Sequence, residues 1–424
     1  MAKIPNLNLI PQAIKDKYQI SGQSLFHNKI VNSELDVYKG EPKDEIKITL
    51  GSVNNAEFTP DIEIKRWNEV SFKLKPKLST VATKDKDLSF EGDKVKFKTP
   101  KMDFEMYDVP ATATDEGSYK YIWFLNEKPA TNKIEFDIET SGLDFFYQPP
   151  LNVENTDPNL TCTETQCKDV NGNVVMERPE NVVGSYAVYH STKGGMVDAY
   201  GKDYKTGQAF FIYRPHLIDA NGLEAWGILN ISDPIEILPD GTEKRIYSVK
   251  LPDDFYNKAV SPIKSNDTFG YTTIGGSANS WVVNYVRITQ FALGVAGTIT
   301  DMTMYLNNSG GNPTGRLGYY GDNGDNPGSF VVGSSEQTIS STGWANFDFA
   351  DTSAAVGDYW LAHLMGNNAG SPVRYNSSGN QGGYKSTAYP TWPDLSTYTQ
   401  EDGALYSIYA TYTPSGGGVT NHFL

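Results

Sequence analysis

The chain has 424 residues, a formal net charge of −15 and a sequence pI of about 4.8. This length predicts two to four domains, and the acidic balance without any basic stripe excludes nucleic acid as a partner. We expect no membrane contact either, because no apolar run approaches the roughly 20 residues that a membrane helix needs.

Residues 1–40 are predicted to form an N-terminal arm. Pro5, Pro11 and isolated apolar residues cannot build a core alone, so the arm should pack on other proteins. A short helix is predicted at 11–20. The segment lacks the apolar region of a Sec signal peptide, so the protein is expected to stay in the cytoplasm until assembly or release, unless a native leader is missing from this sequence.

Residues 41–150 are predicted to form a β-sandwich domain, because short alternating runs are separated by Gly, Pro, Asn and Asp. "KIEFDIE" at 133–139 places apolar residues on one strand face and three acids on the other. The acids share one environment, whereas catalytic carboxylates need different ones, so we predict a solvated face. "KVKFK" at 94–98 is the expected neighbouring strand of opposite charge. The acids are Glu135, Asp137 and Glu139.

Residues 151–264 are predicted to be a second β domain or a continuation of the first. Cys162 and Cys167 are the only cysteines, and a lone C-x4-C without nearby histidines is a poor zinc site. A small disulfide loop and two free thiols both remain open. A short helix is predicted at 253–260.

Two histidines in this region, His190 and His216, have Ser191, Asp198 and Asp203 nearby in sequence. A Ser-His-Asp triad is recognised by geometry, and the chain has no G-x-S-x-G elbow. We interpret the histidines as structural. The chain has five histidines and no H-E-x-x-H, so we predict no catalytic residues, no metal and no cofactor.

The composition changes near residue 264. Beyond it lie only four of the 36 basic residues but 24 of the 39 glycines. A change of this size indicates a domain boundary. Residues 265–414 are predicted to form one β-sandwich, and residues 415–424 a flexible tail.

Several phrases in this C-terminal third are characteristic: "FGYTTIGGS" (269–277), "VRITQFALGVAGTITDMTMYL" (286–306), "GRLGYYGDNGDNPGSF" (315–330) and "GDYWLAHL" (357–364). The segment resembles an uncharacterised jelly-roll-like β-sandwich module of phage structural and bacterial surface proteins. The resemblance implies a jelly-roll-like fold and brings no catalytic motif. "ITDMTMYL" alternates only loosely, which indicates a β-bulge.

The turn "DNGDNPG" at 322–328 is a weak calcium candidate. Asp322 and Asp325 could supply oxygen ligands, but calcium prefers several of them and no third acid is present. The alternative is a tight turn in which Gly324 and Gly328 take positive φ.

The loop at 382–398 concentrates aromatic residues and is the candidate glycan or receptor site. Exposed rings beside Asn and Asp suit a sugar, which has an apolar face and a polar edge. The competing interpretation is a loop that covers one end of the sandwich. The candidate residues are Tyr384, Tyr389, Trp392, Asp394, Tyr398 and Asn376, with Asn380 beside them.

The sequence therefore predicts an all-β protein of several antiparallel sandwiches and favours a non-enzymatic structural protein of a tailed-phage virion. We expect a head- or tail-attached decoration or fibre component that forms a homo-oligomer and contacts a host-surface glycan. The 26 tyrosines favour such interfaces. The alternative is a bacterial surface or secreted adhesin with a carbohydrate-binding module, located at the cell surface or outside it. A glycan-active enzyme would need two paired carboxylates in a groove, and none stands out.

Overall fold

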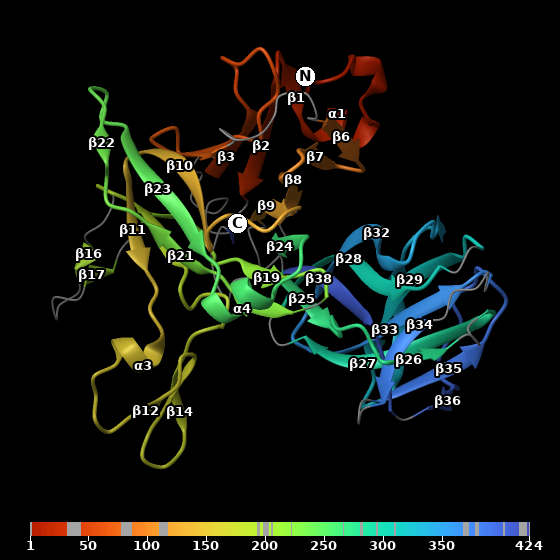
Figure 1. Cartoon of the computed structure of the whole chain (residues 1–424). Coiled ribbons are helices and arrows are strands. Elements are labelled where there is room, and N and C mark those ends of the chain that lie inside the picture. The colour runs from red at the N-terminus through yellow and green to blue at the C-terminus, as the bar shows by residue number, and fades with distance from the viewer. Residues whose placement is uncertain are drawn as a thin grey trace. The chain divides into compact units, whose positions relative to one another are not determined.

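The computed structural model describes the chain as two compact units (Figure 1). The first comprises Met1–Leu217, Ala225–Ser265 and Gly416–Leu424, and the second comprises Ile218–Glu224 and Asn266–Ser415. The described residues are 2–31, 44–77, 87–109, 118–192, 196–197, 203–204, 207–221, 223–265, 267–279, 283–293, 296–308, 311–367, 373–377, 381–401, 403–414 and 422–423.

The first unit contains two large sheets. One of them, sheet A, has the strand order β1 (Gln19–Ser21), β2 (Ser24–Val31), β3 (Asp44–Gly51), β4 (Ile62–Arg66), β5 (Val70–Pro76), β10 (Lys133–Ser141), β23 (Glu243–Lys250) and β21 (Ile228–Ile231), and β22 (Glu236–Ile237) also pairs with β23. All of these pairs are antiparallel. Since β10 pairs with β23, residues on both sides of position 150 share one sheet.

The other large sheet, sheet B, lies opposite. Its order is β11 (Leu143–Tyr147), β15 (Tyr186–His190), β18 (Gln208–Ile212), β39 (His422–Phe423), β9 (Ser118–Leu125), β24 (Ile263–Ser265), β19 (His216–Ile218) and β20 (Glu224–Trp226), with β8 (Met102–Val109), β7 (Lys94–Lys98) and β6 (Asp87–Glu91) branching from β9. Rings from the two sheets meet in the core: Phe72 packs edge-on against Phe210, and Tyr121 against Phe136. The first unit is therefore a sandwich with one continuous core.

Residues 2–31 belong to this sandwich, which differs from the predicted arm. Ile10, Ile14, Tyr18 and Leu25 are each at most 3% exposed and join the core cluster. Pro11 does not interrupt the helix, because it stands at the N-cap of α1 (Gln12–Lys17). Residues 32–40 of the predicted arm lie outside the described residues.

Helices are short, as expected from the strand-rich sequence. Within the described residues they are η1 (Leu7–Leu9), α1, α3 (Leu151–Glu154) and α4 (Asp253–Lys258), and the helices predicted at 11–20 and 253–260 are confirmed as α1 and α4. The first unit also has two small sheets among its described residues. One consists of β12 (Thr161–Cys162), β13 (Gln166–Lys168) and β14 (Val174–Glu177), and the other consists of β16 (Met196–Val197) and β17 (Asp203–Tyr204). Of the predicted flexible tail only 422–423 are described, as β39, which pairs in parallel with β18 and β9.

The second unit also has two sheets. Sheet E holds β25 (Asp267–Gly270), β38 (Ile408–Pro414), β28 (Gly297–Leu306), β32 (Gly343–Ala354), β34 (Val373–Ser377), β26 (Ser277–Asn279) and β37 (Ala404–Tyr406). Sheet F holds β30 (Pro327–Gly333), β29 (Thr314–Asp322), β33 (Gly357–Met365), β27 (Tyr285–Leu293), β35 (Gly382–Ser386), β36 (Thr399–Gln400) and β31 (Gln337–Thr338). Figure 1 shows them in green to blue.

The strand order of the second unit is that of a jelly roll. Strands β25–β38–β28–β32 form the centre of sheet E, and β27–β33–β29–β30 form the centre of sheet F. Successive strands among these eight alternate between the two sheets, except for β29 and β30, which are neighbours in sheet F, and this is the connectivity of two Greek keys. The predicted fold class, an all-β chain of antiparallel sandwiches, is confirmed.

The core of the second unit lies between its sheets. Met302 and Met304 from β28 and Leu317, Tyr319 and Leu361 from sheet F are at most 1% exposed within it. The predicted bulge in β28 is confirmed, because the register with both neighbouring strands shifts between Ile299 and Asp301. A bulge inserts one extra residue, so it explains why the alternation of this strand is loose.

Candidate functional site

The aromatic loop at 387–398 covers the outer face of sheet F. Tyr320 on β29 and Trp360 on β33 alternate along their strands with residues of the inner core, so they point to the opposite face. There they form a second cluster with Leu395 from the loop, which is 1% exposed. Val286, Ile288 and Ala362 complete this cluster, and Trp392 and Tyr398 pack against it.

Trp392 is held by its own domain. Its ring stacks on Phe330 of β30 with centroids 5.1 Å apart and lies edge-on to Tyr320. The guanidinium of Arg316 lies 5.9 Å from the centroid of the indole ring. A Cβ built on Gly333 would come within 2.7 Å of the indole nitrogen of Trp392, so only glycine, which has no side chain, fits at position 333. Trp392 is therefore a packing residue as the structure stands, which is the competing interpretation of the loop.

The three tyrosines of the candidate site lie at different places. Tyr398 packs edge-on against Trp360, and Tyr384 on β35 packs against Tyr285 beneath the guanidinium of Arg287. Tyr389 lies against Gly366, where an added Cβ would come within 2.8 Å of its ring. All three candidate rings are half-buried, so each keeps part of its surface in solvent.

The polar candidates are used within the fold. Oδ1 of Asp394 accepts a hydrogen bond from the backbone N–H of Ser396, and this bond lowers the pKa of the Asp394 carboxyl. Asn376 lies on β34 in sheet E, where it accepts from the N–H of Gly276. The structure therefore does not bring Asn376 together with the aromatic loop, because β34 belongs to the other sheet. Asn380 lies outside the described residues.

Asp322 binds N–H donors in place of a cation. Its Oδ1 accepts from the indole of Trp360 at 2.8 Å and from the side-chain amide of Gln290 at 3.2 Å, and its Oδ2 accepts from the N–H of Asp325. Among the described residues no three His, Cys, Asp or Glu side chains gather as a metal site would require. The segment forms a tight turn. Gly324 has a positive φ, as predicted, and the second residue with a positive φ is Asp325 and not Gly328, for which a positive φ was predicted.

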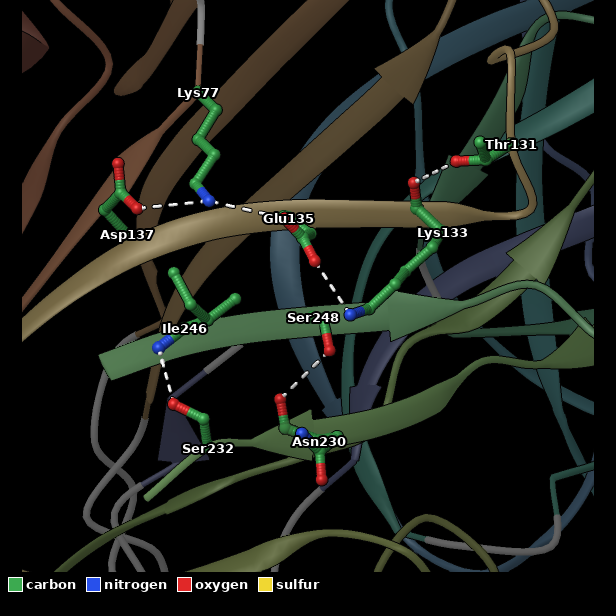
Figure 2. A network of polar contacts seen from close by, with 9 residues as sticks. All are labelled: Lys77, Thr131, Lys133, Glu135, Asp137, Asn230, Ser232, Ile246 and Ser248. Atoms are coloured by element: carbon green, nitrogen blue, oxygen red, sulfur yellow. Dashed lines mark hydrogen bonds and ion pairs between the residues drawn. The ribbon is translucent and has the colours of Figure 1, made fainter. Parts of the chain in front are cut away.

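The acids of β10 lie in a ladder of ion pairs on the solvated face of sheet A (Figure 2). The amine of Lys77 lies 3.3 Å from Glu135 and 3.4 Å from Asp137, and Lys133 lies 2.7 Å from Glu135. The hydrogen bond from Lys133 lowers the pKa of Glu135. A lowered pKa keeps the carboxylate charged, which suits a salt bridge and is the opposite of what a general acid needs.

The predicted partner of this strand was wrong. Strand β10 pairs with β5 and β23 in sheet A, so the cations facing it come from β5 and from its own start. "KVKFK" is β7, which pairs with β6 and β8 in sheet B. Alternation shows that a strand has a charged face, but many lysine-bearing strands would complement it, and only the topology decides between them.

The two histidines considered above have structural partners. Nε2 of His190 lies 3.0 Å from a carboxylate oxygen of Glu69, and its Nδ1 accepts from the N–H of Thr192. The ring of His216 packs on Trp226 with centroids 4.7 Å apart. Ser191 donates its N–H to the carbonyl of Gly142. Asp198 lies outside the described residues, as does the side chain of Asp203.

Cys162 and Cys167 form a disulfide, which decides between the two alternatives left open by the sequence. They face each other across the β12–β13 hairpin. Together with α3 and β14 they form a small module at 151–177 that extends away from the two large sheets of its unit (Figure 1). Cys167 and Leu151 are its buried residues, whereas Val153, Val170, Val174, Val175 and Met176 are 41–82% exposed.

One residue with unusual chemistry went unnoticed in the sequence. His363 on β33 is 1% exposed, and burial together with the charge of Arg287 lowers its pKa to about 3. The sequence "GDYWLAHL" indicates a buried histidine only weakly: His363 is a polar residue at an inward-facing position of a strand whose other inward-facing residues are largely apolar.

Comparison with known proteins adds no relative. No family model matches the chain, and no curated protein matches it. In the part of the chain that the structure describes, no helix has the length and apolar character needed to cross a membrane.

Proposed function

We propose that the protein is a structural component of a tailed-phage virion, attached to the head or tail as a decoration or fibre element. The observation that carries the proposal is the jelly-roll strand order of the second unit. Jelly rolls recur in viral capsid and lectin domains, where rigid sheets present loops outward. The second unit would be a member of the jelly-roll-like modules of phage structural and bacterial surface proteins that its sequence resembles.

Attachment through a free N-terminal arm is no longer the favoured route. Ile10, Ile14, Tyr18 and Leu25 are buried in the core of the first unit, so these side chains are not free to pack elsewhere. We propose that the first unit as a whole contacts other virion proteins and that copies of the chain assemble into a homo-oligomer. The second unit would then present the outer face of sheet F to the host surface.

Glycan contact remains the proposed role for the partly exposed rings of the second unit. Tyr384, Tyr389 and Tyr398 are half-buried and keep ring surface in solvent. Such rings can stack on the apolar face of a sugar. Tyr389 and Tyr398 belong to the loop that covers the outer face of sheet F, whereas Tyr384 is the cross-strand partner of Arg287 and points to the inner side of the sheet with it.

The same rings support the alternative, a bacterial surface or secreted adhesin that carries a carbohydrate-binding module. The two functions differ in what the protein is bound to. A virion component should sediment with particles at fixed stoichiometry, whereas an adhesin should be found on cells or free in the medium.

The deciding experiment locates the native protein. Antibodies raised against the purified full chain would be used for immunogold labelling and for following the protein through a density gradient of phage particles. Labelling at a regular position on heads or tails supports the virion role. Labelling of bacterial cells without phage, together with glycan-array binding by the full chain, would overturn it in favour of the adhesin.

A further inference from the structure

His363 is a buried histidine with unsatisfied ring nitrogens. It points into the core between the sheets of the second unit and is 1% exposed. Within the described residues neither Nδ1 nor Nε2 has a hydrogen-bond partner. A buried polar group without a partner costs free energy, and a buried charge without one costs far more.

Among the residues that the structure describes, the surroundings of His363 hold the positive charge of Arg287 and no anion bonded to the ring. Arg287 lies directly across from it on β27, and Leu317 on β29 lies on its other side. The ring of Tyr406 on β37 meets the imidazole edge-on with centroids 4.9 Å apart. Three further titratable groups among the described residues lie near this point: Glu401, Tyr384 and Tyr375. The carboxylate of Glu401 and the hydroxyl of Tyr406 both accept a hydrogen bond from Arg287. Tyr384 lies against the same guanidinium, and Tyr375 packs against Tyr406.

Protonation of His363 is therefore strongly disfavoured in the closed sandwich. A second cation would lie beside Arg287 in a buried core, and Glu401, the carboxylate that the described residues place there, is already hydrogen-bonded to Arg287. The repulsion and the lost hydration both oppose the charged form. In an opened unit the imidazole meets water and takes up a proton with a normal pKa of roughly 6.5.

We propose that His363 makes the second unit open on acidification, with proton uptake coupled to the separation of β33 from β37. The closed form binds no proton at this site, and the open form binds one. The sign follows from linkage: the closed form is fully favoured above about pH 6.5 and loses ground as the pH falls below that value. The ratio of open to closed molecules should rise about tenfold per pH unit until the buried imidazole itself titrates, at a pKa of about 3.

The experiment is hydrogen exchange of the full chain between pH 8 and pH 5, corrected for intrinsic exchange and read out in peptides that cover β33 and β37. The wild type should show about a thirtyfold rise in opening at pH 5. His363→Phe keeps a ring of similar size against Tyr406 and cannot bind a proton, so its opening should be independent of pH in these peptides. The matched control is His190→Phe in the first unit, which should leave the acid response of the second unit unchanged.

An acid response that persists in His363→Phe would overturn the proposal, as would a wild-type response confined to the first unit. If His363→Phe fails to fold, the wild-type imidazole can be followed by NMR. A His363 resonance that stays neutral in the closed unit down to pH 5 supports the proposal. One that titrates near pH 6.5 while the unit remains closed refutes it.

Discussion

The indole Nε1 of Trp360 donates a 2.8 Å hydrogen bond to Oδ1 of Asp322. Trp360 has no exposed surface, so this carboxylate satisfies a buried donor at the centre of the outer face of sheet F. The same oxygen accepts from Gln290 on β27, so one side chain at the end of β29 holds two neighbouring strands.

Asp322→Ala should therefore destabilise the second unit. The indole and amide donors would be left without an acceptor, and hydrogen bonds to a charged group contribute about 1.5–3 kcal/mol each. We expect the free energy of unfolding to fall by about 3–6 kcal/mol in urea denaturation followed by tryptophan fluorescence. Asp322→Asn keeps an acceptor oxygen and should lose less. A gain of stability on adding calcium that Asp322→Asn abolishes would instead revive the metal interpretation.

Trp392→Ala should lower the stability of the same unit, because the ring packs on Phe330 and Tyr320. A fully buried tryptophan costs about 3–5 kcal/mol when truncated, so a half-buried one should cost about 2–3 kcal/mol. Trp392→Phe retains a stacked ring and serves as the control. The measurement is the urea midpoint alongside glycan-array binding. Loss of binding at unchanged stability would show that the ring faces a ligand.

Ile14→Ala should destabilise the first unit by about 2–5 kcal/mol, because Ile14 has no exposed surface in the core. Leu9, only five residues earlier, is 75% exposed, so Leu9→Ala should change the free energy of unfolding by less than about 0.5 kcal/mol. Differential scanning calorimetry of the full chain compares the two variants. Equal, small effects would restore the arm as a free segment.

Reduction of the Cys162–Cys167 disulfide should loosen the module at 151–177 and leave the two large sheets intact. The bridge closes a loop with a sequence separation of 5. Closure of so short a loop contributes about 2 kcal/mol in the chain-entropy model. Hydrogen exchange of peptides from 155–180 should accelerate with reductant and in Cys162→Ser, while exchange in β10 stays constant. Acceleration that extends to β10 would mean that the module supports the sandwich.

Local chemistry in the sequence determined a good part of this protein. Alternation in "KIEFDIE" predicted a buried and a solvated face, which β10 has, because a strand's period of two does not depend on its neighbours. Loose alternation predicted the bulge of β28, and the helix signals at 11–20 and 253–260 are equally local. The change of composition at 264 falls beside Ser265, the last residue of its segment of the first unit.

The tertiary structure alone decided which segments meet. Strand β10 pairs with β5 where β7 was expected, and Asn376 lies on sheet E whereas Trp392 packs on sheet F. The N-terminal residues pack into a core whose other members come from strands as far along the chain as β23. His363 owes its chemistry to Arg287 and Tyr406, which lie 76 and 43 positions away in the sequence. The physical reason is that the burial of a side chain and the loss of its hydrogen-bond partners depend on contacts with residues distant in sequence. The alternation of polar and apolar residues within one strand does not determine those contacts.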